Sequence, residues 1–186
     1  MKQDENDWQN AADELRNDTL LQAAVVDEHR RIYSRYFLHD PAANHVLPVM
    51  THAFRRLEQW RVFLLLTPWM LSRLFIPDGA PGWRIPPDWQ AHNRRDRDYQ
   101  VIGPTFELPL LTGKQRAHLN YSPAIGHYLL HPLILSMLNF SCAEEAFTAW
   151  NRVIETRNRN IEKLQKRNPL QQEITRREFF RGIFNE

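Results

Sequence analysis

The pattern of apolar and polar positions near the start of the chain predicts an amphipathic helix. Apolar side chains recur at helical spacing within residues 21–36, so a helix is expected over residues 19–37. Asp18 and Thr19 offer an amino-terminal cap, and Gln22 is placed to complete a capping box with Thr19.

The next apolar segments predict extended structure followed by a short helix. Residues 46–50 are expected to form a short extended segment, in which Pro48 favours an edge position. The continuous apolar run at residues 60–66 is typical of a strand buried on both faces. Thr67 then resembles an amino-terminal cap and Pro68 a first-turn proline, so a short helix is expected directly after the strand.

The middle of the chain predicts a long loop, a strand pair and one ambiguous segment. Residues 78–98 are rich in proline, glycine and arginine and are expected to form a loop. Residues 99–111 contain one predicted strand, and residues 117–121 are its expected hairpin partner. The apolar density of residues 125–138 fits a buried strand and a helix equally well.

A long helix is predicted near the carboxyl terminus, because residues 141–144 form a Ser-x-x-Glu capping box that opens a helix over residues 142–167. The element order predicts an α+β single domain, in which a small antiparallel or mixed sheet packs with an N-terminal and a long C-terminal helix. The predicted boundaries are a flexible acidic amino terminus (1–18), an α+β domain (19–168) and a basic, aromatic tail (169–186).

The composition is that of an ordinary globular protein. The 186 residues, 42% of them hydrophobic, suffice for one domain with its own core. Cys142 is the single cysteine, which excludes an internal disulfide and a cysteine-pair metal site within the chain. Residues 1–5 are polar, and the longest apolar stretch, residues 62–71, is interrupted by Pro68 and too short to span a bilayer. A cytoplasmic protein without membrane insertion is therefore expected.

Charge is distributed unevenly, although the formal net charge is only +2. Residues 1–18 are mainly acidic, residues 152–181 are rich in lysine and arginine, and Arg94, Arg95 and Arg97 crowd the predicted loop. These cations make a nucleic-acid or acidic-surface binding module the alternative function. Glutamates interleave with the cations of the tail and weaken their field, so nucleic acid is not favoured as a partner.

Histidine and cysteine offer few grounds for catalysis. His127 and His131 stand four residues apart, which on a helix would place both rings on one face as metal ligands, with His118 as a third. Packed or surface histidines are the more common case, and Pro132 disfavours helical geometry at His131. Cys142 is expected to be a small buried residue rather than a nucleophile. The sequence thus predicts a protein that is not an enzyme and holds no metal or cofactor; a metal- or thiol-dependent enzyme is the third reading.

The junction after the buried strand, from Trp69 to Phe75, is apolar nearly all round. A helix of this kind must be buried on several sides or present an apolar patch. Core packing is the default interpretation. A ledge of Trp69 and Met70 beside a sheet edge, forming a groove for an apolar peptide, is the alternative.

The segment Thr67–Ser72, preceded by the apolar strand that Trp60 opens, resembles the signature of the HybE/HupJ-type family of NiFe-hydrogenase assembly chaperones. The similarity covers about residues 20–155, whereas residues 115–141 are longer than the family pattern. It extends through residues 21–24, 37–39 and 75–77 and continues, more weakly, through residues 83, 103–107 and 143–150.

The resemblance implies an assembly and proofreading chaperone that binds a hydrogenase precursor subunit or its signal peptide. The implied client is the small subunit that carries a twin-arginine export signal, which would be held back from export until its cofactors are inserted. A homodimer is left open. Six residues are expected to contact the client: Trp60, Thr67, Pro68, Trp69, Met70 and Trp83.

The carboxyl-terminal tail contains a second resemblance. Residues 175–181 resemble a twin-arginine export motif, with the arginine pair Arg176 and Arg177 and the aromatic pair Phe179 and Phe180. The favoured interpretation is an amphipathic tail that packs its phenylalanines onto the protein. The alternative is that the tail imitates the signal of the client and occupies its site, in which case deleting the tail tightens signal-peptide binding.

Overall fold

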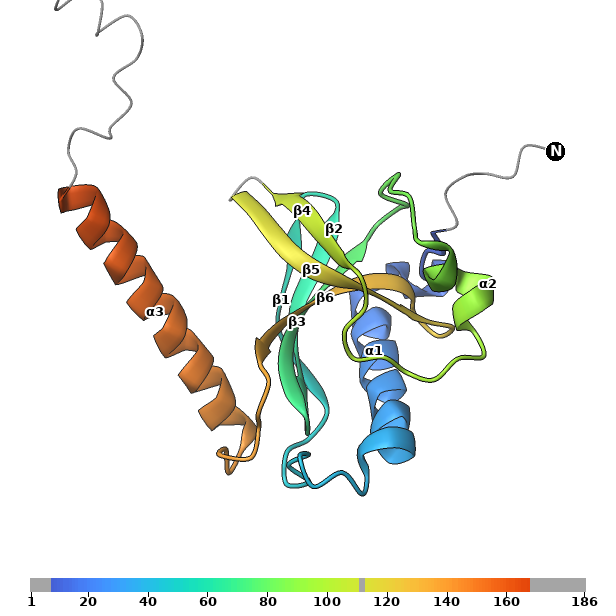
Figure 1. Ribbon diagram of the computed structural model, residues 1–186, viewed down its shortest axis with the longest axis horizontal. Coiled ribbons are helices and arrows are strands. Elements are labelled where there is room, and N and C mark those ends of the chain that lie inside the picture. Colours follow the sequence, from blue (N-terminus) through green and yellow to red (C-terminus); the bar gives the residue numbers. More distant parts are fainter. Residues whose placement is uncertain (1–7, 111–112, 168–186) are drawn as a thin grey trace, which may run out of the picture. The chain divides into compact units, whose positions relative to one another are not determined.

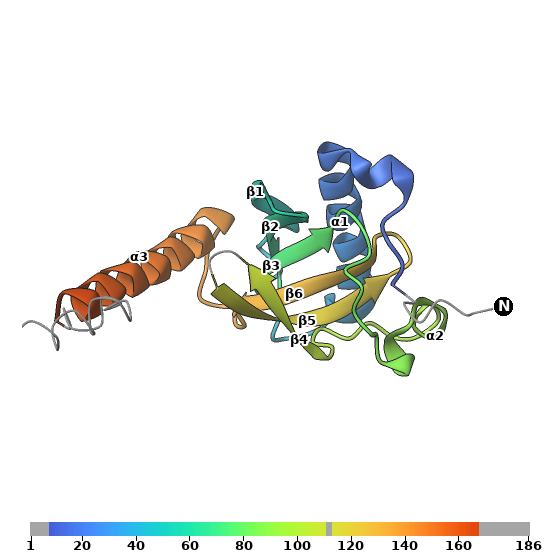
Figure 2. The same ribbon diagram turned by 90° about the horizontal axis from the view of Figure 1, so that it is seen from above.

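Six strands form one antiparallel sheet in the computed structural model, which describes residues 8–110 and 113–167 (Figures 1 and 2). The strand order is β1-β2-β3-β6-β5-β4, and every neighbouring pair is antiparallel. This arrangement confirms the predicted α+β class. The elements are η1 (Asp13–Arg16), α1 (Asp18–Ile32), η2 (Tyr33–Phe37), β1 (Met50–Leu57), β2 (Trp60–Thr67), β3 (Met70–Pro77), η3 (Pro87–Trp89), α2 (Ala91–Arg94), β4 (Thr105–Leu110), β5 (Gly113–Ser122), β6 (Gly126–Ile134) and α3 (Ala143–Arg167).

Helix α1 confirms the predicted amphipathic helix and continues into the π-helical turn η2. Its buried apolar residues Leu21, Val25 and Ile32 share one face, which lies against the sheet. The predicted amino-terminal cap, Asp18 or Thr19, was wrong. Asn17, which has an extended backbone, is the cap, and its Oδ1 accepts the N–H groups of Thr19 and Leu20 at 2.9 and 3.1 Å.

The predicted short helix after β2 was wrong: the segment is strand β3, and β2 and β3 form a hairpin. Thr67 Oγ1 accepts the Met70 N–H at 3.1 Å and donates to the Met70 carbonyl at 2.8 Å, which closes the turn around Pro68 and Trp69. A central strand is apolar on both faces, so its composition matches that of a fully buried helix. β3 lies between β2 and β6 and is buried along almost its whole length.

The other half of the sheet follows the predictions more closely. β4 and β5 form the expected hairpin, although its tip at residues 111–112 lies outside the described residues. The ambiguous segment is mostly strand β6, and Pro132 sits beside a register shift in its pairing with β3, where a missing N–H is tolerated. At the opposite edge the predicted extended segment was too early, since β1 begins only at Met50.

Each face of the sheet carries its own apolar cluster. On one face α1 packs over side chains that include Phe63, Leu65, Leu74 and Tyr128. On the other face, side chains of the segment between β3 and β4 pack over the sheet residues Trp60, Val62, Phe75, Leu119 and Leu129. The packing side chains are Trp83, Ile85 and Trp89, together with Trp8 from the amino-terminal segment.

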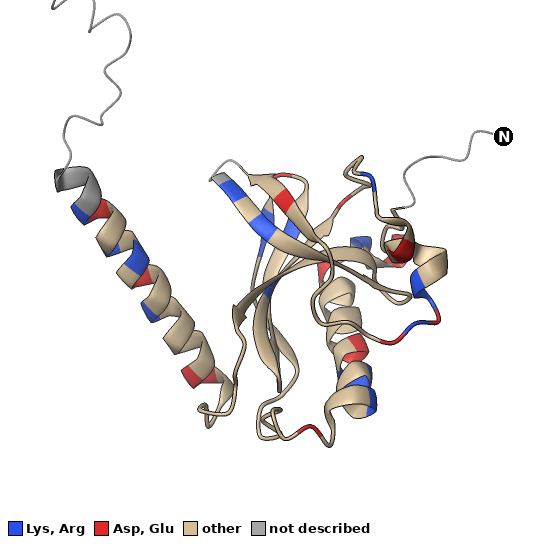
Figure 3. Ribbon diagram, viewed as in Figure 1, with Lys and Arg blue, Asp and Glu red and all other residues tan. Residues whose placement is uncertain are grey.

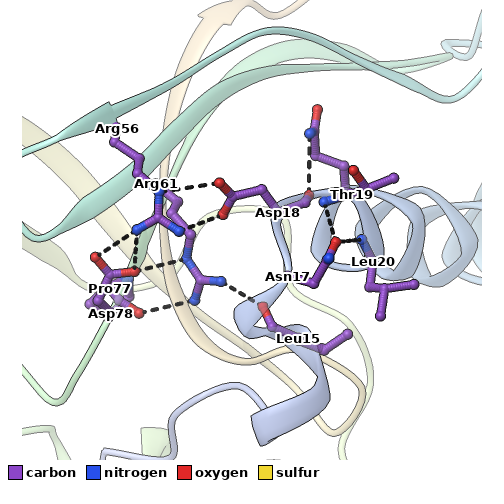
Figure 4. Close-up of polar contacts among 10 residues, drawn as sticks. Leu15, Asn17, Asp18, Thr19, Leu20, Arg56, Arg61, Pro77 and Asp78 are labelled. Atoms are coloured by element: carbon purple, nitrogen blue, oxygen red, sulfur yellow. Dashed lines mark hydrogen bonds and ion pairs between the residues drawn. The ribbon is translucent and has the colours of Figure 1, made fainter.

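An ion-pair network fixes the amino-terminal end of α1 to one corner of the sheet (Figure 4). Arg56 of β1 donates to the carboxylate of Asp18 at 2.8 and 3.1 Å and lies 3.3 Å from Asp78. Arg61 of β2, only 3% exposed, pairs with Asp78 at 3.2 Å and donates to the Leu15 carbonyl at 2.6 Å. Both arginines therefore serve the fold, because their charges are compensated inside it.

The chain divides into two compact units between Ala146 and Phe147, within α3. At the amino terminus of α3 the predicted partner of Ser141 was wrong by one residue: the Glu145 carboxylate, rather than that of Glu144, accepts the Ser141 N–H at 2.8 Å. This hydrogen bond lowers the pKa of Glu145. Farther along the helix, Val153 and Ile161 are exposed.

Candidate functional site

An open cleft of about 470 Å3 lies between the carboxyl-terminal end of α1 with η2, the loop that follows α2, and the turn between β5 and β6. Basic positions, all of them arginine here, mark the ends of α1 and α2 that border this region (Figure 3). We call it the arginine cleft, after the five arginines of its lining: Arg31, Arg35, Arg94, Arg95 and Arg97.

A buried carboxylate joins two walls of the arginine cleft. Glu28, 6% exposed, accepts two hydrogen bonds from Arg31 at 2.7 and 2.9 Å and one from the Ser122 hydroxyl at 2.7 Å. Burial alone would raise the pKa of Glu28, but the hydrogen bonds from Arg31 and Ser122 lower it below its ordinary value. Glu28 is therefore ionised at neutral pH, and its charge compensates that of Arg31.

Arg94 is a cation of the cleft that is nearly buried, with 9% of its surface exposed. Its guanidinium lies 4.5 Å from the centre of the Trp89 ring, and Nη2 donates to the Asp98 carbonyl at 2.8 Å. Burial, and then the charge of Arg97, lowers the pKa of Arg94. Its Nε makes no hydrogen bond to the described part of the chain. The guanidinium is thus fixed in place although its Nε has no partner among the described residues.

The remaining cations of the cleft are exposed and only weakly compensated. Arg35, Arg95 and Arg97 are exposed, and Arg35 lies 3.9 Å from the carboxylate of Asp98, an ion pair that solvent screens. Two carboxylates, those of Glu28 and Asp96, stand among the lining residues against the five arginines, which leaves a formal charge of +3. A concave site with this excess attracts anionic groups.

The family-model comparison covers most of the chain. Residues 20–182 match the model described as "NiFe-hydrogenase assembly, chaperone, HybE". The chain belongs to the HybE family of NiFe-hydrogenase assembly chaperones. The match confirms the resemblance that the Thr67–Ser72 segment suggested.

Two further comparisons accompany the family match. The solution structure of HybE from Escherichia coli is similar, with 22% sequence identity and a TM-score of 0.44, over 65% of this chain and 65% of that chain. No curated protein matches. Within the described residues of this HybE-family chain, no helix is long and apolar enough to cross a membrane.

The six residues expected to contact the client lie mainly in the core. Trp60, Thr67 and Met70 are at most 2% exposed, Trp69 is 8% exposed, and Pro68 is buried between them. The Trp69 ring stacks on Phe37 with 4.1 Å between ring centres. The half-buried sixth residue, Trp83, stacks between Trp60 and Phe106, at 5.6 Å from each ring. Their contact with a client stays a prediction.

The three histidines considered as metal ligands do not come together as a site. His127 is fully buried; its Nδ1 accepts the Gln9 N–H and its Nε2 donates to the Trp89 carbonyl, both at 2.8 Å. His118 and His131 bond backbone carbonyls at 2.9 and 2.6 Å. Among the described residues no group of three or more His, Cys, Asp or Glu side chains is arranged to hold a metal ion.

Two other predictions have different outcomes. Cys142 is exposed, so the expectation that it is a small buried residue was wrong: it precedes α3 rather than lying inside its first turn. The tail with Arg176, Arg177, Phe179 and Phe180 lies outside the described residues.

The sequence flagged Arg94, Arg95 and Arg97 as a charged loop but missed the site they belong to. The spacing of Glu28 and Arg31 was a usable signal, since residues three apart on a helix are neighbours. It shows an ion pair on α1, but not that Ser122 and the loop after α2 meet it there.

Proposed function

We propose that this chain binds a NiFe-hydrogenase precursor subunit during maturation, with the small subunit that carries a twin-arginine signal as its client. The family match over residues 20–182 is the observation that carries the proposal. In this proposal the protein acts by binding alone, without catalysis, in the cytoplasm, where a precursor is found before export. Binding would keep the precursor from export until its cofactors are in place.

The region around the β2–β3 turn remains our proposed region of client contact, but its buried and exposed residues have different roles. In this proposal the buried Trp69 and Met70 hold the turn in place, and exposed side chains beside the turn supply most of the contact surface. Asn44 joins two segments to this turn: its own loop before β1 and the segment that follows β6. Its N–H donates to the Pro68 carbonyl at 2.7 Å, and its side-chain amide donates to the carbonyls of Met137 and Phe140.

Exposed apolar side chains on those joined segments are the proposed contacts. Val46 is 75% exposed, Leu135 67% and Leu138 54%. Apolar surface of this kind is what an incompletely folded precursor, with its own core residues still exposed, would cover. Trp83, which is half-buried, is retained as a proposed contact on the other side of the sheet.

The test is a calorimetric titration of the full chain with purified small-subunit precursor, and in parallel with the precursor lacking its signal and with the large-subunit precursor. We expect binding of the complete small-subunit precursor and at least tenfold weaker binding without the signal. Equal affinity with and without the signal would refute signal recognition. Binding of neither subunit would refute the proposed function.

Variants then locate the contact. Val46→Glu with Leu138→Glu places charge on the proposed apolar surface and should weaken binding by about tenfold or more. Leu20→Glu with Ile102→Glu is the matched control: it adds the same two charges at side chains that are also about half exposed (52% and 48%) but lie on α1 and on the loop before β4. An equal loss in the control would remove the assignment of the surface.

A further inference from the structure

We propose that the arginine cleft binds an acidic polypeptide segment of the client, separate from the client's export signal. The inference deepens the proposed function and rests on it for the identity of the partner. The recognised chemistry is a set of carboxylates, from aspartate and glutamate side chains or a free chain end, entering between α1, the loop after α2 and the β5–β6 turn.

The charges of the cleft favour an anion. Arg31 is already paired with Glu28, which removes both from the balance. Three exposed arginines, Arg35, Arg95 and Arg97, then face one lining carboxylate, Asp96, with Asp98 beside Arg35. An arginine fork binds a carboxylate through two parallel hydrogen bonds, so several arginines held around one concavity are suited to an acidic segment.

Arg94 provides a second, independent observation. It is about nine-tenths buried, lines the cleft, and has an Nε donor without a partner among the described residues. The Nε itself is covered by the protein, but the charge of a nearly buried guanidinium is costly, and an anion bound in the cleft would offset that cost. Its stacking on Trp89 and its bond to the Asp98 carbonyl hold it still, so a bound carboxylate need not order it.

The size and lining of the cleft favour a peptide over nucleic acid. About 470 Å3 is the volume of a pocket for a few side chains, whereas nucleic-acid binding relies on a continuous cationic track along many phosphates. Carboxylates of Glu28, Asp96 and Asp98 interrupt any such track.

The same charges argue against the twin-arginine signal as the ligand of this cleft. A signal with two adjacent arginines would bring like charge to a concavity that already holds an excess of arginine, and like charges at an interface oppose binding. A client engaged at both places would present its signal elsewhere and an acidic segment here.

The test uses fluorescence anisotropy with a fluorescein-labelled peptide, Gly-Glu-Glu-Asp-Glu-Glu-Gly, and the full chain. The cleft variant combines Arg35→Gln, Arg95→Gln and Arg97→Gln. The control variant removes three exposed arginines outside the cleft lining, Arg55→Gln, Arg84→Gln and Arg152→Gln, so both variants change the net charge equally.

We expect the cleft variant to lose affinity by about tenfold or more and the control by less than about threefold. A peptide with glutamine and asparagine in place of the acids should not bind. Equal losses in the two variants would overturn the proposal, because binding would then follow net charge alone. Tighter binding of a labelled single-stranded thymidine 15-mer than of the acidic peptide would overturn it in favour of nucleic acid.

Titration with the small-subunit precursor separates this proposal from the function it rests on. Wild-type binding that the cleft variant weakens supports both. Wild-type binding that the cleft variant leaves unchanged overturns the cleft proposal and leaves the proposed function standing. Peptide binding lost in the cleft variant, without precursor binding, supports an acidic-segment site and overturns the proposed client.

Discussion

The buried, neutral histidine His29 of α1 makes the free energy of unfolding depend on pH, and substituting this residue should remove its part of that dependence. His29 is 1% exposed, and its Nδ1 donates to the Val25 carbonyl at 2.8 Å. Its Nε2 is buried without a partner in the described structure, among the rings of Tyr99 and Tyr128. Protonation would place an unpaired N–H and a positive charge there, and burial accordingly lowers the pKa of His29 from 6.5 to about 4.

The magnitude follows from the difference between the folded and unfolded pKa. As the pH falls below 6.5, His29 becomes protonated in the unfolded chain, whereas in the folded chain it stays neutral down to about pH 4. The free energy of unfolding therefore decreases across this window. The loss between pH 7 and pH 5 is about 2 kcal/mol, and it grows to about 3 kcal/mol at pH 4. These amounts are a large part of the stability of an ordinary domain.

The assay is urea unfolding of the full chain at pH 7, 6 and 5, followed by tryptophan fluorescence. His29→Leu removes the titrating group, so its loss of stability between pH 7 and pH 5 should be about 2 kcal/mol smaller than that of the wild type. His92→Gln, at an exposed histidine, is the control and should keep the wild-type pH dependence. If His29→Leu and the wild type lose stability in parallel, His29 is not the source of the pH dependence.

Three other substitutions test the packing that holds the two sides of the sheet. Asp78→Asn leaves Arg61 nearly buried with less compensation and should lower the free energy of unfolding by about 1–3 kcal/mol in urea titrations; a cost no larger than that of an exposed pair would contradict the network. Thr67→Val removes both turn hydrogen bonds to Met70 and should cost about 1–3 kcal/mol, and an unchanged urea midpoint would contradict it. Gly103→Ala adds a methyl group that overlaps the Leu119 carbonyl and the Trp89 ring, so the thermal midpoint should fall by several degrees; an unchanged midpoint would show that the loop yields freely.

The sequence predicted those parts of the fold whose pattern is local. The apolar period of α1 and the continuous run of β2 each identify one element without knowledge of its neighbours. The residues after Thr67 did not identify their element, because an apolar segment that begins with Thr-Pro fits a buried helix as well as a central strand. Only the pairing of β3 with both β2 and β6 decides between them.

The candidate site depends on contacts that the sequence does not reveal. Arg35 and Arg95 are 60 positions apart in the chain, and they border one cleft because Tyr36 and Arg35 of η2 contact Asp98 in the loop after α2. By contrast, the family signature around Trp69 is local and visible in the sequence, but it marks residues that the core needs. The segment that the sequence identifies most readily is therefore buried in the core, whereas the exposed cleft depends on contacts between distant segments.

Native mass spectrometry of the full chain mixed with the small-subunit precursor of a NiFe-hydrogenase would show directly whether the two proteins bind. We expect a stable complex with the complete precursor, and a complex greatly reduced in abundance when the twin-arginine signal is removed. An unrelated precursor with a twin-arginine signal should form little complex. No complex with either hydrogenase subunit, or equal complex formation with the unrelated precursor, would contradict an assembly chaperone for NiFe-hydrogenase.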